Sequence, residues 1–293
     1  MTLLMWIALV LLGAAAVAIG LSAFGAARWA AAMGRRLTAL EATRLPPETM
    51  RYDEGELDGL PAPVQRYFRS VLRDGQPIIT AATFAMTGSF NMSATGEQWK
   101  PFSSQQRVVT RRPGFLWDAR IALLPGLPVR VIDSYSAGHG QLQAALLGFF
   151  KVADIRGGGE IARSEFMRYF AEMLWYPTAL LPSQGMHWAA VDECSANATF
   201  ADGPLALTLL FRFNEAGLID AFRAEARGGM VGDEMLMAPW EGRFANYRKY
   251  DGVNVPMTGE VAWLRPDGRK PYFRGRLTAL RYEFSALAVL PGD

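Results

Sequence analysis

Cysteine and histidine are almost absent from this sequence of 293 residues, which holds one of the first and two of the second. A single cysteine, Cys194, cannot form an internal disulfide or supply a structural zinc site. His139 and His187 are too few for most metal-hydrolase sites or nucleophilic triads. We therefore expect no metal and no disulfide framework.

Motifs typical of hydrolases and cofactor-dependent enzymes are also missing. There is no G-x-S-x-G, no H-E-x-x-H, no phosphate-binding glycine loop and no dinucleotide fingerprint. The sequence also has no large excess of charge of one sign, because it contains 30 basic and 28 acidic residues. That balance gives no field strong enough to attract nucleic acid. The sequence thus predicts no cofactor, no catalytic residue and no nucleic-acid partner.

The chain begins instead with a long apolar run. Residues 2–27 contain no charged side chain and, at 1.5 Å per residue, are long enough to cross a bilayer as a helix. We expect residues 1–44 to form a single-pass transmembrane anchor followed by a stem. A cleaved signal peptide is the alternative, but it requires a basic n-region, and nothing basic precedes Leu3 except the amino terminus.

Residues 45–293 are predicted to fold as one β-rich domain that begins with a short amphipathic helix at 60–73. Apolar and polar residues then alternate, so that Trp117 faces one side of its strand and Asp118 the other. Pairs such as Asp251-Gly252 are strong signals of hairpin turns, and short connections imply antiparallel neighbours. About eleven or twelve strands are expected.

A helix predicted at 160–176 interrupts the strands. Its apolar arc is wider than half the helix circumference, which indicates a buried helix, and Glu165, Arg168 and Glu172 share one narrow stripe. Pro177 ends it. The expected fold is therefore mainly β with α: a strongly curved antiparallel sheet, shaped like a half-open barrel, wrapped around a central helix.

The polar stripe is the main candidate site. Arg168 can reach Glu165 at i−3 and Glu172 at i+4, and a buried guanidinium usually takes a carboxylate partner, here Asp118 or Asp133 from a strand. In one interpretation Arg168 simply ties the helix to the sheet. In the other, the stripe lines a pocket and holds an acidic or polar head group.

Tryptophan provides a second signal, because an indole usually buries its ring and makes one hydrogen bond. Core packing accounts for most of the eight tryptophans. Trp117, Trp175 and Trp240 are the candidates for a cavity wall, since each adjoins a charged or kinked position.

Three strings resemble a bacterial family of uncharacterised membrane-anchored proteins, a domain of unknown function, over about residues 60–284. They are 113–119 (PGFLWDA), 168–182 (RYFAEMLWYPTALLP) and 238–242 (APWEG). That family is similar in architecture to the lipoprotein-carrier fold, a half-open antiparallel barrel whose helices close an apolar cavity. The resemblance implies this fold and transfers no catalytic residue.

Three functions follow from these observations. The leading hypothesis is a membrane-tethered binding protein with an apolar cavity for a lipid-like or other hydrophobic ligand. The second is an enzyme, such as a hydrolase, with an acid–base site built from Arg168, Glu172 and Asp118. The third is an envelope scaffold that binds other proteins and exposes a large apolar patch.

The side of the membrane is a separate prediction. We expect an anchor in the bacterial inner membrane, with Arg28, Arg35, Arg36 and Arg44 following the apolar run. The positive-inside rule would keep the domain in the cytoplasm, whereas the lipoprotein-carrier resemblance favours the outer, periplasmic side, which we predict. A carboxy-terminal alkaline phosphatase fusion should then be active, and bright fluorescence of a cytoplasmic reporter with no phosphatase activity would contradict this.

Overall fold

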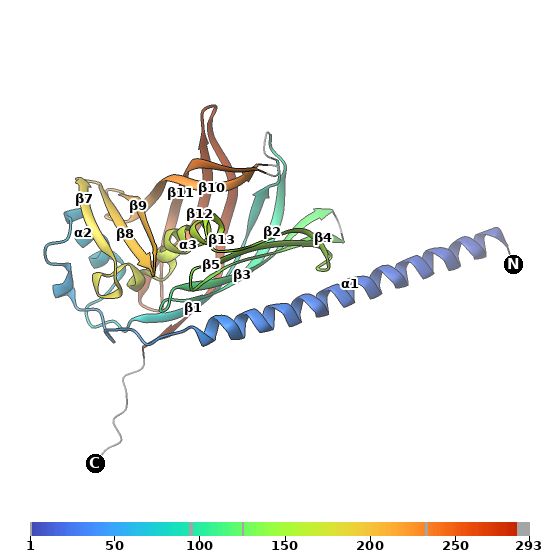
Figure 1. Cartoon of the computed structure of the whole chain (residues 1–293), viewed down its shortest axis with the longest axis horizontal. Helices are drawn as coiled ribbons and strands as arrows, with labels where there is room; N and C mark the ends of the chain where they lie inside the picture. The colour runs from blue at the N-terminus through green and yellow to red at the C-terminus, as the bar shows by residue number, and fades with distance from the viewer. Residues whose placement is uncertain (1, 94–95, 125, 232–233, 286–293) are drawn as a thin grey trace, which may run out of the picture.

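One antiparallel sheet of thirteen strands dominates the part of the chain that the structure describes, residues 2–93, 96–124, 126–231 and 234–285 (Figure 1). The structure is a computed structural model. The strand order is β6-β5-β4-β3-β2-β1-β13-β12-β11-β10-β9-β8-β7, so β6 and β7 form the two edges and the sheet does not close into a barrel. The predicted class, a half-open antiparallel sheet, is confirmed.

The strands are, in chain order, Ile79–Asn91 (β1), Trp99–Val109 (β2), Gly114–Leu124 (β3), Leu127–Ser136 (β4), His139–Leu146 (β5), Phe150–Gly157 (β6), His187–Asp192 (β7), Ser195–Asp202 (β8), Leu205–Phe213 (β9), Ile219–Val231 (β10), Glu234–Tyr250 (β11), Val253–Arg265 (β12) and Gly268–Phe284 (β13). The helices are Leu3–Ala42 (α1), Ala62–Val71 (α2) and Glu160–Ala171 (α3). Short 3-10 turns cover Glu54–Leu57, Glu172–Trp175, Pro177–Leu180 and Pro182–Gln184.

The strand count exceeds the expected eleven or twelve because a reversal at residues 147–149 separates β5 from β6. Leu147 and Gly148 both have positive φ, 53° and 82°, as the two central residues of a tight hairpin turn require. Leucine is seldom found in that conformation, so only Gly148 gave a signal in the sequence.

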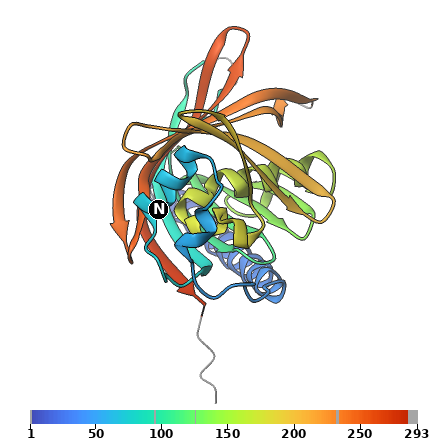
Figure 2. The same ribbon diagram turned by 90° about the vertical axis from the view of Figure 1, so that its left-hand side faces the viewer.

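The central helix lies inside the curve of the sheet, as Figure 2 shows. α3 packs against β3, β4 and β5 on one wing and against β9 and β10 on the other. Phe166 and Phe170 are completely buried between the wings. The α-helix ends at Ala171, earlier than predicted, and tightens into a 3-10 turn before Pro177, whose ring cannot continue a helix.

Glycines in register allow aromatic rings to lie flat on the inner face of the sheet. Gly275 of β13 pairs with Gly88 of β1 and with Gly259 of β12. A Cβ on Gly275 would lie 2.7 Å from the Phe273 ring, and one on Gly88 would lie 1.9 Å from the backbone oxygen of Arg274 and 2.9 Å from the Phe102 ring. A side chain at Gly275 would displace the Phe273 ring, and one at Gly88 would also force the neighbouring strand β13 away.

The second half of α1 packs on the outer face of the sheet, so the predicted stem is part of the packed structure. Trp29 and Leu40 are 2% and 3% exposed, and Trp29 Nε1 donates a hydrogen bond to Asp118, at 2.8 Å. Arg36 donates to Gln143 of β5, also at 2.8 Å. The first half is free of protein contacts, and the helix is long and apolar enough to span a membrane.

Candidate functional site

A cavity of about 320 Å³ separates α3 from the inner face of the sheet. Its walls are mostly aromatic and come from β3, the 3-10 turn after α3, and β10 to β12: Trp117, Trp175, Phe222, Trp240, Phe244 and Trp263. A cluster of charged side chains from α3, β4 and β10 interrupts this wall. The combination of apolar walls and a few convergent polar groups is typical of a small-molecule site.

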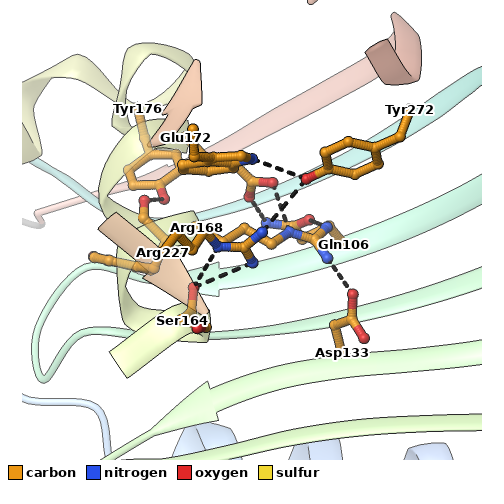
Figure 3. A network of polar contacts seen from close by, with 10 residues as sticks. Gln106, Asp133, Ser164, Arg168, Glu172, Tyr176, Arg227 and Tyr272 are labelled. Atoms are coloured by element: carbon orange, nitrogen blue, oxygen red, sulfur yellow. Dashed lines mark hydrogen bonds and ion pairs between the residues drawn. The ribbon is translucent and has the colours of Figure 1, made fainter. Parts of the chain in front are cut away.

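Arg168 is the centre of the charged cluster (Figure 3). Its Nη1 lies 2.5 Å from Asp133 Oδ2 of β4 and its Nε lies 2.9 Å from Glu172 Oε1, one helical turn on. The guanidinium also lies over the Trp117 ring, 4.5 Å from the centroid. Burial alone would lower its pKa, but Glu172 and Asp133 outweigh burial and hold the pKa above its ordinary value. Arg168 is therefore a permanent cation that ties α3 to the sheet.

Gln106 of β2 completes the ring of contacts around Arg168. Its side-chain oxygen accepts a hydrogen bond from Arg168 Nη2, at 3.3 Å, while its nitrogen donates to Glu172 Oε2. Gln106 is 2% exposed. Each oxygen of Glu172 thus accepts a hydrogen bond within this network.

A second arginine, Arg227 of β10, enters the cavity and was not predicted from the sequence. Its Nε and Nη2 donate to the backbone oxygen of Ser164 on α3, each at 3.3 Å, and its Nη1 donates to the Tyr272 hydroxyl, at 3.4 Å (Figure 3). The guanidinium lies 4.4 Å from the centroid of the Trp240 ring. Among the described residues, no carboxylate lies within 4 Å of Arg227.

A β-bulge explains why alternation failed at Arg227. In β10 the inward side chains are Phe222 and Ala224, so strict alternation puts Arg227 on the solvent face with Arg223. The register between β10 and β11 shifts between Ala224 and Arg227, which turns Arg227 inward. Gly228-Gly229 directly after Arg227 is the only signal in the sequence, because glycine within a strand often marks a bulge.

Glu165 is the most unusual group in the cavity wall. Its side chain is 3% exposed, Oε2 has no hydrogen-bond partner, and no described residue bonds to its carboxyl group. Burial, together with the negative charge of Asp133, raises the pKa of Glu165 to about 8. Oδ1 of Asp133 is also buried without a partner. The predicted contact between Arg168 and Glu165 is therefore not formed.

All predicted site residues except one line the cavity: Trp117, Asp133, Glu165, Arg168, Glu172, Trp175 and Trp240. Asp118 is the exception, and its prediction as a site residue is wrong. The pleat of β3 directs it to the outer face, where burial raises its pKa and Trp29 of α1 is its partner. An acid–base pair of Glu172 and Asp118 is accordingly excluded.

The family of the chain follows from a sequence comparison. Residues 58–282 match the model of a family of unknown function, DUF6920, and the protein belongs to this family. Membership in an uncharacterised family, expected from the three strings, is confirmed. No curated protein matches the sequence.

Two solved structures are similar to this chain. A LolA superfamily protein from Nitrosomonas europaea shares 10% identity at a TM-score of 0.32, over 69% of this chain and 86% of that one. A β-barrel-like protein of a domain of unknown function, DUF1849, from Brucella abortus shares 9% identity at a TM-score of 0.21, over 73% and 99%. No residue role or ligand is transferred from either.

Removal of Arg168 should destabilise the protein strongly. Arg168→Ala leaves Asp133 and Glu172 buried without a cation, so we expect a loss of about 3–5 kcal/mol in the free energy of unfolding. Arg168→Lys should restore only part of it, because an ammonium group cannot make the same forked contacts. Arg163→Ala, on the same helix and without an ion pair, is the control. A melting temperature for Arg168→Ala within about a degree of wild type would contradict this role.

Glu165 should make stability depend on pH. Its native pKa of about 8 lies above the value for an unfolded chain, so the native state keeps a proton that the unfolded state releases. Stability should therefore fall as pH rises from about 4.5 to 8, by up to a few kcal/mol, and level off above 8. In Glu165→Gln this contribution should vanish. Urea unfolding of both proteins at pH 5 and pH 8 measures it, and equal pH dependence in the two would refute the assignment.

Proposed function

We propose that this protein is a membrane-tethered binding protein whose cavity holds a lipid-like molecule. The observation that supports this most directly is the pairing of aromatic walls with buried polar atoms that lack partners in the same cavity. A cavity lined by apolar groups alone would stay dry, whereas buried polar atoms without partners require a partner such as water or a ligand.

The apolar part of the ligand would lie between aromatic rings. Trp175 and Phe244 both line the cavity and are buried, with their ring centroids 5.8 Å apart. The volume, about 320 Å³, is at the lower end of the range for small-molecule pockets, so one slender chain fits better than a bulky ring system.

The polar part of the ligand would lie at the charged cluster. Arg227 offers a cation with no carboxylate partner, while Glu165 Oε2 and Asp133 Oδ1 are without hydrogen bonds. A head group that accepts from Arg227 and donates to one of the two carboxyl groups, such as a hydroxyl or a phosphate ester with a neighbouring hydroxyl, would satisfy Arg227 and one of the two unpartnered oxygens.

Anchoring is the remaining part of the proposal. α1 would cross the inner membrane with its free first half and hold the domain on the outer side with its docked second half. A binding site attached in this way lies close to the membrane surface, where it can bind ligands that reside in that membrane or leave it.

Native mass spectrometry tests the ligand. The full-length protein, extracted in a mild detergent and released from it in the gas phase, should retain a lipid-like molecule. The Gly259→Val variant should lose this molecule. A Cβ atom at this position would lie 3.6 Å from Phe244 and 3.7 Å from Trp175, which are ordinary contact distances, so the valine side chain would fill the part of the cavity next to these two rings. Thr258→Val, next in the strand and facing outward, is the control. Equal ligand content in both variants, or none in wild type, would reject the proposal.

A further inference from the structure

Exposed apolar side chains gather at the hairpin ends of one end of the sheet. Among the described residues after position 44, six of the ten large apolar side chains that are exposed lie there, each between 43% and 69% exposed. We call these six the hairpin rim: Met92 after β1, Leu124 at the end of β3, Phe150 and Val152 of β6, and Leu236 and Met237 of β11.

The rim belongs to one end of the sheet because of the strand directions. In the antiparallel order, the β1–β2, β3–β4, β5–β6 and β10–β11 connections all lie at the same end, and the β2–β3 and β4–β5 connections lie at the other. The Leu147 amide donates to the Pro128 oxygen, at 3.1 Å, which joins two of the rim hairpins side by side. In Figure 1, β3 and β4 extend toward the side on which the amino-terminal half of α1 lies.

The helix α1 passes this end of the sheet where its apolar run is about to finish. A Cβ on Gly25 would lie only 2.1 Å from the Leu147 oxygen, and the rings of Phe24 and Phe149 are 6.1 Å apart. The first charged side chain, Arg28, follows within one turn. If residues before this point span the bilayer, the β5–β6 turn is level with the membrane surface.

Two arginines behind the rim provide independent support. Arg120 of β3 and Arg130 of β4 are directly opposite each other on the outer face, and like charges in that position are unfavourable. Neither has a carboxylate within 4 Å among the described residues, Asp118 on the same face acts on both only at longer range, and Arg130 Nε is buried without a partner beside Trp29. Phosphate groups of lipids at this depth would neutralise the pair.

We propose that the hairpin rim rests in the surface of the membrane that α1 crosses, with Arg120 and Arg130 at the anionic head groups. The proposal rests on the membrane anchoring of the proposed function and adds the direction of the cavity. Among its partly exposed lining residues, Phe90 and Trp263 are within two residues of the ends of β1 and β12, on the side of the rim, while Leu142, Ile155 and Ile161 line it near the β5–β6 edge. We infer that ligands enter on the side of Phe90 and Trp263. Ligands then pass between bilayer and cavity without crossing water.

Depth-dependent quenching tests this in the full-length chain. The single cysteine is first removed by Cys194→Ser. Three variants of this protein are then made, each with one cysteine on the rim: Leu124→Cys, Phe150→Cys and Leu236→Cys. Each variant is labelled with an environment-sensitive fluorophore and placed in nanodiscs of phosphatidylcholine and phosphatidylglycerol, with one protein molecule per nanodisc. Lipids with a nitroxide near the top of the acyl chain should reduce the emission at these sites about twofold, as expected for groups that enter the interface. Val191→Cys, equally exposed on the edge strand β7, should be nearly unaffected.

A fifth labelled site distinguishes the membrane contact of the rim from the membrane anchor. Leu12→Cys, in the middle of the apolar run, must be quenched if α1 spans the bilayer. Quenching at Leu12 without quenching at the rim overturns the membrane contact and leaves the anchor intact. No quenching at either overturns both. Emission shifted to the blue at the rim without quenching indicates a covering protein and also overturns the proposal. Ligand content, measured by mass spectrometry, is independent of these results.

Discussion

The ion pairs of Arg168 are the interaction on which the rest of the structure depends. A helix enclosed by a curved sheet can rotate or slide unless something directional fixes it, and apolar packing has little direction. Arg168 joins Asp133 of β4, Glu172 of the 3-10 turn after α3 and Gln106 of β2 in one network. The network determines how far α3 stands from the sheet, and the cavity is the space that this distance leaves open.

A consequence is that the two arginines of the cavity have different roles. The charge of Arg168 is neutralised by two carboxylates, so its role is to hold α3 in place against the sheet. Arg227 is held by a backbone oxygen, a tyrosine hydroxyl and the Trp240 ring, and it acts on the carboxyl groups of Asp133 and Glu165 only at longer range, without a direct ion pair. Glu165, which has no hydrogen bond, is the natural site for a proton or a donor from a ligand. Stability and binding are thus assigned to neighbouring but distinct groups.

Much of the fold could be predicted because it rests on local patterns. Period-two alternation located the strands, and the broad apolar arc of α3 identified the helix that the sheet encloses. The same alternation already opposed Trp117 to Asp118, so Asp118 was a poor partner for Arg168. The turn at Leu147 and the inward position of Arg227 could not be found in this way, because a left-handed leucine and a bulge both depend on tertiary packing that overrides local preference.

The direct test of the account is an experimental structure of the full-length protein in nanodiscs, at a resolution that shows ordered lipid. The account predicts elongated density that runs from Trp175 to the mouth near Phe90, with its polar end within hydrogen-bond distance of Arg227. A cavity closed by the surrounding side chains, or filled only by ordered water, would contradict the central claim that α3 and the sheet hold open a site for a lipid-like ligand.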